Sequence, residues 1–183
     1  LLKTQFSEGF KLQRKTWEEA LLVWNLCGFV QMISLETKSI QKGLYSETDE
    51  WHRRNIIKQA YIMMYESSDD LLQQTGKQFL DMISELCPEE KVDRFKLERK
   101  KWSLFRKEHE AEFQKVRNNV GAHREHDIIE QINTIGELNW SRSIELLLEY
   151  EKLTLEIAPC FSELIPVVVD KIGKFHNAHL VRK

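Results

Sequence analysis

The segment RNNVGAHRE, residues 117–125, places an arginine and a histidine six positions apart beside two asparagines. Arg117 and His123 are the only Arg–His pair in the chain at that spacing. A guanidinium binds phosphate well because its donors form a planar fork that makes two parallel hydrogen bonds. An imidazole has an ordinary pKa of about 6.5, so it exchanges protons near neutral pH. The two groups suffice for metal-free RNA cleavage: His123 moves the proton of the 2′-hydroxyl or of the leaving oxygen, and Arg117 stabilises the phosphorane charge.

A long helical pattern leads into this segment. Six side chains that step by three or four residues form one narrow apolar stripe on an ideal helix: Trp102, Phe105, His109, Phe113, Val116 and Val120. If the helix continues, His123 falls within the stripe and Arg117 lies at its edge. Asn119 shares the face of His123, whereas Asn118 points nearly opposite the stripe. Gly121 weakens the helix here, which predicts a helix end or a distorted turn with polar groups facing a packing surface.

Other polar residues around the segment are candidates for RNA binding. Residues 94–107 include seven basic side chains and one acidic side chain. Lys100 and Lys101 of this stretch would steer RNA toward the motif on the same helix. The alternative is an ordinary solvated face, since acidic residues flank the stretch on both sides. Asn119 and Arg124 of the motif segment are further candidates for RNA binding. His126 directly follows the segment and is either a second proton donor that also binds RNA or a solvated residue.

The composition predicts one soluble helical domain over residues 1–183. Hydrophobic residues make up 42% of the chain and charged residues 31%, which is typical of globular proteins and not of disordered ones. With only 7 Gly and 3 Pro, long helices are favoured over a many-stranded sheet. The formal net charge is −2, whereas a general nucleic-acid coat protein is strongly basic. Binding of a polyanion therefore requires a local patch.

The remaining reactive groups show no pattern of a cofactor or metal site. Cys27, Cys87 and Cys160 are far apart in the sequence and lack metal-ligand spacing, so we expect reduced thiols in a cytoplasmic protein. Asp69 and Asp70 are adjacent carboxylates without further ligands at matching spacing, so we expect neither metal nor cofactor. No purely apolar run approaches the roughly 20 residues of a membrane span, and there is no signal-peptide pattern. We therefore expect no contact with a membrane.

Helix start and stop signals predict an all-α antiparallel bundle of four to five helices. The expected helices run from Thr16 to Gly43, from Ser46 or Thr48 to Leu86 with a possible bend at Gly76, from Pro88 through the motif, from Asn139 after a loop around Gly136, and from Pro159 to Phe175. Thr16 and Glu19 fit a capping box at the first of these starts. Pro159 and Pro166 are expected to break or kink the chain near its end.

The motif segment resembles the HEPN superfamily. An Arg followed by Asn, and then by His after four to six intervening residues, is typical of that family when it lies on the later helices of a bundle. The sequence RNNVGAHRE is similar to the motif in the branch of this family that is found in phage-defence and toxin–antitoxin systems. By position, Arg117 matches the motif Arg, Asn118 the polar residue after it and His123 the motif His. One departure is that Asn118 faces away from the stripe, so either Gly121 distorts the helix or Asn119 takes the part of Asn118.

The resemblance implies an HEPN-like homodimer in which the motifs of two chains meet in one cleft. Such a protein would be a metal-independent endoribonuclease that leaves a 2′,3′-cyclic phosphate. RNA would be its substrate, and an antitoxin such as a small nucleotidyltransferase would be a possible partner. Two alternatives stay open. One is a non-catalytic HEPN-like module that binds a nucleotide, RNA or a protein, and the other is a plain helical interaction protein.

Overall fold

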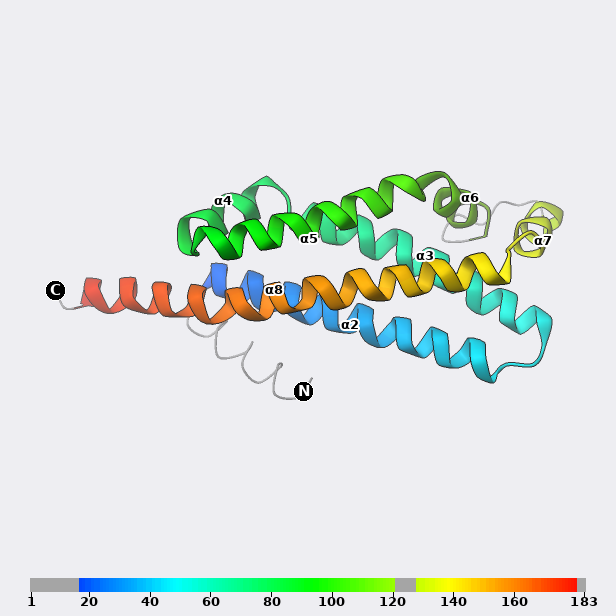
Figure 1. The fold of residues 1–183 in the computed structure, drawn as a ribbon, viewed down its shortest axis with the longest axis horizontal. Helices are drawn as coiled ribbons and strands as arrows, with labels where there is room; N and C mark the ends of the chain where they lie inside the picture. The colour runs from blue at the N-terminus through cyan, green and yellow to red at the C-terminus, as the bar shows by residue number, and fades with distance from the viewer. Residues whose placement is uncertain (1–16, 121–127, 181–183) are drawn as a thin grey trace.

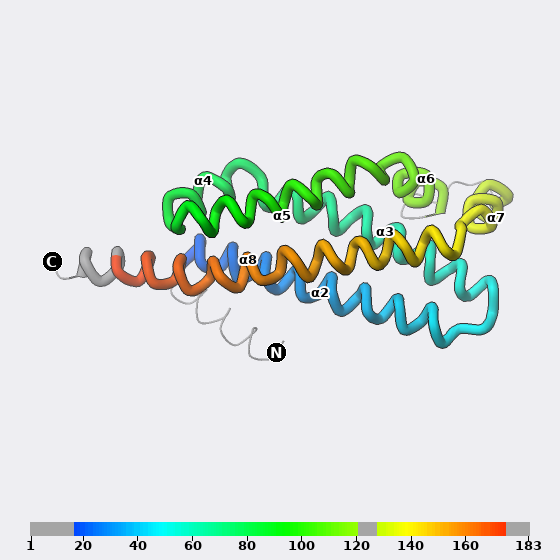
Figure 2. The backbone as a smooth tube through the Cα atoms, viewed as in Figure 1, coloured from blue at the N-terminus to red at the C-terminus, as the bar shows by residue number. Residues whose placement is uncertain are grey.

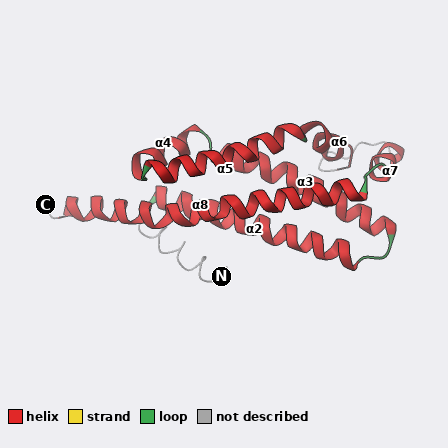
Figure 3. Cartoon of the chain, in the orientation of Figure 1, coloured by secondary structure: helices red, strands yellow, loops and turns green. Residues whose placement is uncertain are grey.

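A computed structural model describes residues 17–120 and 128–180 of the chain. Within these residues, all regular secondary structure is α-helical (Figure 3), which confirms the expected all-α class. The described helices are α2 (Glu18–Ser46), α3 (Glu50–Gln74), α4 (Lys77–Leu86), α5 (Glu89–Glu108), α6 (Glu110–Val120), α7 (Ile128–Gly136) and α8 (Trp140–Leu180). The described part of the chain thus holds seven helices, where the sequence predicted four or five.

Four long helices form the body of the molecule. In Figure 1, α2, α3, α5 and α8 run along its length, with α4 near one end and α6 and α7 near the other. The colour gradient of Figure 2 shows that α2 and α5 run in one direction and α3 and α8 in the opposite one. α8 packs against α2 and α5, and α6 packs against α3 and α7. The expected antiparallel bundle is therefore present, and α6, which carries Arg117, lies at one end of it.

Aromatic side chains fill much of the interior. Phe79, Phe95 and Phe161 form one group near α4, with ring centroids 5.3–6.2 Å apart. A second group lies around Tyr150, whose ring centroid is 5.0 Å from that of Trp102. All six residues of the predicted stripe are buried. Such ring pairs add about 0.5–1.5 kcal/mol beyond the burial of their area, so they fix the long helices that support the motif end.

Two helix starts differ from the prediction. α2 begins at Glu18 with Trp17 in the capping position, and among the described residues no side-chain hydrogen bond caps this start. Trp17 therefore occupies the place predicted for Thr16, which lies outside the described residues. At the start of α3 the cap is Asp49, whose side chain accepts a backbone N–H at 2.9 Å. The predicted caps Ser46 and Thr48 are wrong, because the carboxylate one residue further on makes this bond.

Two glycines act differently from one another. α2 continues past Gly43, which was expected to end it. A Cβ at Gly43 would lie 3.3 Å from Ile56 Cδ1, so the glycine lets α2 and α3 approach closely. The bend expected at Gly76 is a full break between α3 and α4. There Thr75 is buried, and its hydroxyl donates to the carbonyl of Leu71 at 2.6 Å.

The single helix predicted through the motif is in fact two helices. α5 begins after Pro88, and Glu89 and Glu90 lie in its first turn, where carboxylates interact favourably with the helix dipole. The helix ends at Glu108, and His109 adopts φ −104° and ψ 9° between α5 and α6. His109 still donates its backbone N–H to Phe105 at 3.1 Å. The apolar spacing continues through His109, and no Gly or Pro marks the break. The sequence therefore did not predict it.

α8 is one continuous helix of 41 residues (Figure 1). The predicted break at Pro159 and Pro166 is wrong. Both proline side chains are exposed, so the carbonyl groups that lose a helical partner lie on the solvent side, where water can bind them. The expected loop after Gly136 is present, since α7 ends at that residue and α8 begins at Trp140.

One described helix has the length and composition of a membrane span. α2 contains an apolar window with a mean hydropathy of 1.3, of which 39% is buried inside the bundle. A core helix of a soluble protein passes the same test, and α2 buries Val23, Leu26 and Val30. By packing, α2 is a core helix of this bundle.

Candidate functional site

Arg117 lies in the last turn of α6 and points toward α3. Its side chain is 28% exposed, and its Nε lies 3.7 Å from a carboxylate oxygen of Glu66. The guanidinium carbon is 5.2 Å from the ring centroid of Tyr65, within the range of a cation–π contact. The Nε is buried and has no hydrogen-bond partner among the described residues. Arg117 is therefore held near α3 without a close carboxylate partner there.

The two asparagines after Arg117 have different surroundings. Asn118 is exposed, as the helix geometry predicted. Asn119 donates to Thr134 Oγ1 at 3.1 Å and to Glu130 Oε1 at 3.2 Å, which joins α6 to α7. The amide of Asn119 thus serves the packing of two helices in this structure, whereas Asn118 faces solvent.

The other motif residues cannot be placed beside Arg117. His123, Arg124 and His126 belong to residues 121–127, which lie outside the described part of the chain. The predicted pairing of His123 with Arg117 stays a prediction. What the structure does place is the end of α6 and the start of α7, on either side of this segment.

A second arginine lies against the same aromatic ring. Arg106 comes from the end of α5, and its guanidinium carbon is 4.1 Å from the ring centroid of Tyr65. Its side chain is only 10% exposed. The nearest carboxylate oxygens belong to Glu110, at 3.4 Å, and Asp69, at 3.8 Å. Its Nε and Nη1 are buried without a hydrogen-bond partner among the described residues.

Sequence reasoning did not single out Arg106 or Tyr65. Arg106 was one of the seven basic residues of 94–107, which were assigned as a group to RNA steering or to a solvated face. Tyr65 lies on α3, more than forty positions earlier in the chain than either arginine. Only the burial of Arg106, which follows the buried Phe105, distinguishes it from its basic neighbours.

The two lysines proposed for RNA steering also differ. Lys100 is exposed on α5. Lys101 lies 2.8 Å from Glu98 and 2.9 Å from Glu156, so it joins α5 to α8. Hydrogen bonds to these carboxylates raise the pKa of Lys101, and the bond from Lys101 lowers the pKa of Glu156. Of the two, Lys100 keeps an ammonium group facing solvent.

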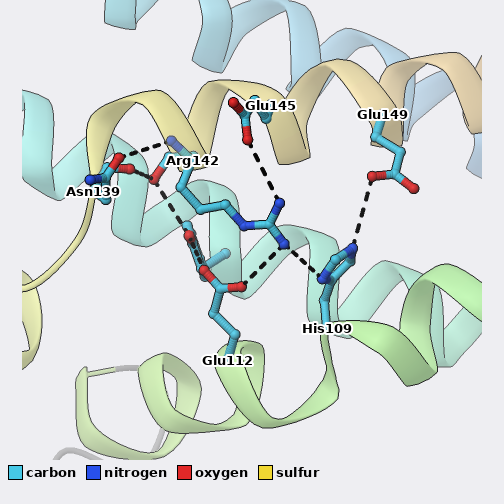
Figure 4. Close-up of polar contacts among 8 residues, drawn as sticks. His109, Glu112, Asn139, Arg142, Glu145 and Glu149 are labelled. Carbon is cyan, nitrogen blue, oxygen red and sulfur yellow. Dashed lines mark hydrogen bonds and ion pairs between the residues drawn. The ribbon is translucent and has the colours of Figure 1, made fainter.

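A polar network surrounds the break between α5 and α6 (Figure 4). His109 is buried, in contact with the rings of Phe105 and Phe113. Its Nδ1 lies 3.1 Å from Nη2 of Arg142 on α8. A guanidinium is only a donor, so Nδ1 accepts, and the neutral ring carries its hydrogen on Nε2. That Nε2 faces Glu149 at 3.9 Å. His109 is therefore a buried histidine of the core, as its place on the predicted apolar stripe implied.

The network continues to α3 through a tyrosine. The Tyr61 hydroxyl donates to Glu112 at 2.6 Å, and the second carboxylate oxygen of Glu112 lies 3.7 Å from Arg142. Ser143 adds a contact to the same hydroxyl at 3.5 Å. Burial, and then the bond to Glu112, raise the pKa of Tyr61 well above its ordinary value. Tyr61 therefore remains a donor at neutral pH, and the network ties α3, α6 and α8 together.

The other acidic and thiol groups form no reactive centre among the described residues. No group of three or more potential metal ligands occurs among residues 17–120 and 128–174, whose side chains are described. Asp69 is near Arg106, and Asp70 is exposed on α3. Cys87 and Cys160 are buried, and burial raises the pKa of both thiols. These groups offer no reactive thiolate at the surface.

An apolar surface adjoins the motif segment on its other side. Ile128, Ile129 and Ile132 of α7 are 61%, 67% and 47% exposed. α7 follows residues 121–127 directly, so these side chains lie next to the candidate site in the chain. Solvent-exposed isoleucines gathered on one short helix are typical of a surface that contacts another molecule.

Comparison with known proteins gives no relative for this chain: no family model, curated protein or solved structure matches it.

Proposed function

We propose that the protein is an HEPN-like endoribonuclease that cleaves RNA without a metal, in a bacterial defence or toxin–antitoxin system. Arg117, Asn118 and His123 would form its catalytic site. The observation that carries the proposal is the state of Arg117 at the end of α6. It is partly exposed, it lies next to the segment that contains His123, and its closest ion-pair distance among the described residues is 3.7 Å.

The contacts of Arg117 leave it able to bind a phosphate. Glu66 is 48% exposed, and exposed ion pairs contribute only about 0–1 kcal/mol. A phosphate bound through two short hydrogen bonds would replace this distant carboxylate. Tyr65 would keep the guanidinium oriented while the exchange takes place. His123 would then move the proton of the attacking 2′-hydroxyl or of the leaving oxygen, which gives a 2′,3′-cyclic phosphate.

The roles of the asparagines follow from their surroundings. Asn118 faces solvent beside Arg117, so its amide is available to orient the substrate. Asn119 holds α6 to α7 through Thr134, which gives it a supporting role at the same end of the bundle. Lys100, Arg124 and His126 are proposed to bind RNA around this centre.

A homodimer is the proposed assembly. The exposed isoleucines of α7 adjoin the motif segment, so a second copy that covers them would bring two motif segments together. Light scattering should then give twice the 21.8 kDa chain mass. Ile132→Glu should yield monomers and abolish cleavage. Leu155→Glu, on the similarly exposed Leu155 of α8, is the matched control and should remain dimeric and active. If the parent protein is a monomer and still cleaves RNA, the proposal of a site shared by two chains is wrong.

Substitutions at the motif test the chemistry. His123→Ala should reduce RNA cleavage by about 10²–10⁴-fold with little change in RNA affinity, because proton transfer acts in the transition state. Arg117→Ala should lower both rate and affinity, and Arg117→Lys should restore little, since an ammonium lacks the planar fork. Cleavage should persist in EDTA. Cleavage that requires added Mg²⁺, or a folded Arg117→Ala variant as active as the parent, contradicts the proposal.

A non-catalytic HEPN-like module is the second candidate. The contacts that favour it are those of Arg117 with Glu66 and of Asn119 with Thr134, because both hold α6 to neighbouring helices. In that case RNA, a nucleotide or a protein partner would bind without being cleaved, and His123→Ala would lower the unfolding temperature instead of a rate. Co-purification with an antitoxin such as a small nucleotidyltransferase would support the toxin assignment and a cytoplasmic location.

A further inference from the structure

Tyr65 is the common contact of two arginines that come from different helices. Arg106 at the end of α5 and Arg117 in α6 both place a guanidinium carbon within 5.2 Å of its ring centroid. Of these two arginines, only Arg117 belongs to the sequence motif. The structure therefore brings a second, unassigned cation to the candidate site.

Arg106 is an unusual buried charge. Its side chain is 10% exposed, so its guanidinium has lost most of its water. Buried charges are normally paired closely and hydrogen-bonded, because desolvation is expensive. Here Nε and Nη1 have no hydrogen-bond partner among the described residues, and the carboxylates of Glu110 and Asp69 lie at 3.4 and 3.8 Å. A buried donor without a partner is an exception in native structures, and a functional role is one of its recognised explanations.

One of the two carboxylates near Arg106 is easily displaced. The Asp69 side chain is 64% exposed, and its Oδ1 lies 3.8 Å from Nη2 of Arg106. An exposed ion pair at that distance contributes little to stability. A phosphate oxygen that reaches Nη2 would take the place of Asp69 and would form a shorter, charge-assisted bond.

We propose that Arg106 is a second phosphate-binding residue, which holds the RNA backbone at a phosphate next to the one held by Arg117. Tyr65 acts as a positioning residue that orients both guanidinium groups. Asp69 occupies the Arg106 side of the site when RNA is absent. This inference rests on the proposed ribonuclease function, since it assigns a further contact to the same site.

Salt-dependent RNA binding tests the proposal. The probe is a labelled oligouridylate with 2′-O-methyl riboses, which cannot be cleaved through the 2′-hydroxyl. Arg106→Gln should weaken binding roughly tenfold, as expected for one lost hydrogen bond to a charged group. It should also reduce the slope of log K against log salt by about 0.7, the value for one phosphate contact on a single strand. Arg94→Gln is the control on the same helix, because Arg94 is bonded to Glu163 at 2.6 Å and should not change the slope.

A second variant separates binding from folding. Asp69→Asn should tighten binding of the same probe by about two- to fivefold, because it removes the competing carboxylate. Asp70→Asn, the exposed neighbour, should have less effect. A purely structural role for Arg106 predicts no gain in affinity from Asp69→Asn. This variant changes an exposed side chain, so it gives an answer even if Arg106→Gln fails to fold.

The outcomes distinguish the two proposals. The second phosphate contact is wrong if Arg117→Gln reduces the slope of log K against log salt, whereas folded Arg106→Gln leaves that slope unchanged and Asp69→Asn does not tighten binding of the probe. The ribonuclease proposal survives this result. If the parent protein does not bind the probe, both are wrong. A smaller slope of log K against log salt for Arg106→Gln, together with tighter binding of the probe by Asp69→Asn, supports the second phosphate contact.

Discussion

Tyr61 and Tyr65 lie one helical turn apart on α3, and each is the centre of a polar cluster that includes α6. Around Tyr61, donors and acceptors meet at hydrogen-bond distance: the hydroxyl is 2.6 Å from Glu112, and Arg142 is 3.1 Å from His109. Around Tyr65, the shortest separation between a guanidinium nitrogen and a carboxylate oxygen of the described residues is 3.4 Å, between Arg106 and Glu110. The two clusters occupy neighbouring positions but satisfy their polar groups to different degrees.

This difference separates a structural role from a functional one. Buried polar groups in native proteins are hydrogen-bonded with few exceptions, and a fully paired network holds helices in one arrangement. The Tyr61 cluster comes closer to this character and ties α6 to the bundle, although His109 Nε2 is buried without a hydrogen-bond partner among the described residues. The Tyr65 cluster holds two guanidinium groups with no carboxylate oxygen closer than 3.4 Å among the described residues, and we propose that an anionic substrate binds them. We therefore expect substitutions in the first cluster to reduce stability and substitutions in the second to reduce RNA binding.

The largest expected loss of stability comes from His109→Ala. The substitution removes a buried ring between Phe105 and Phe113 and the acceptor of Arg142, so it should lower the free energy of unfolding by about 3 kcal/mol. For a chain of this size the melting temperature should fall on the order of 10 °C. Urea unfolding monitored by circular dichroism measures this loss. His52→Ala, on an exposed histidine of α3, is the control. Equal losses for both variants would contradict the structural role of the Tyr61 cluster.

A matched pair of tyrosine variants gives the next largest effect. Tyr61→Phe removes the donor to Glu112 and leaves a carboxylate without its partner, so the free energy of unfolding should fall by about 1–3 kcal/mol. Tyr65→Phe keeps the ring that contacts both arginines and should change stability by less than about 0.5 kcal/mol. The same unfolding measurement serves for both. The comparison between the clusters does not hold if Tyr65→Phe is the more damaging change.

Arginine variants of the second cluster should have small effects on stability. Arg106→Gln and Arg117→Gln each remove a charge that is only loosely paired, together with a cation–π contact worth about 0.5–1 kcal/mol. Their free energies of unfolding should therefore stay within about 1 kcal/mol of the parent, although RNA binding falls. A loss as large as that of His109→Ala would assign the second cluster to the fold and would favour the non-catalytic module.

Alkaline pH should reduce the stability that Tyr61 contributes in the first cluster, with no effect near neutrality. Burial and the bond to Glu112 raise the pKa of Tyr61 above the ordinary tyrosine value of about 10. A raised pKa means that the stability contributed by this group is complete below about pH 10 and declines as pH rises further, because the unfolded state loses the proton first. Unfolding free energies of the parent should fall above pH 10, and those of Tyr61→Phe should fall less steeply. Equal slopes would show that Tyr61 does not titrate with unfolding.

Periodicity predicted the elements that support the site. The stripe from Trp102 to Val120 is buried as expected, and its spacing placed Arg117 at the edge of the packed face. The break at His109 was not predicted because no Gly or Pro marks it. His109 instead lies where Arg142 supplies a polar partner from another helix. The spacing of residues within one segment does not reveal a hydrogen bond to a different helix.

The two polar clusters were beyond prediction for the same reason. Tyr61 meets Glu112 across 51 positions of the chain, and Tyr65 meets Arg106 and Arg117 across similar separations. The sequence also left Asn118 and Asn119 as alternatives for one role. The structure separates them, because Thr134 of α7 accepts a hydrogen bond from Asn119 while Asn118 faces solvent. The place of His123 relative to Arg117 stays a prediction.

The two prolines of α8 give this helix a preferred plane of bending. Pro159 and Pro166 are seven residues apart, so they lie on nearly the same side of the helix, and both are exposed. Each removes one backbone hydrogen bond from that side, while the opposite side keeps its ladder. The rod formed by α8 is therefore softer toward bowing in the plane through its prolines than in the perpendicular plane, so any flexing of this end of the bundle should be directional.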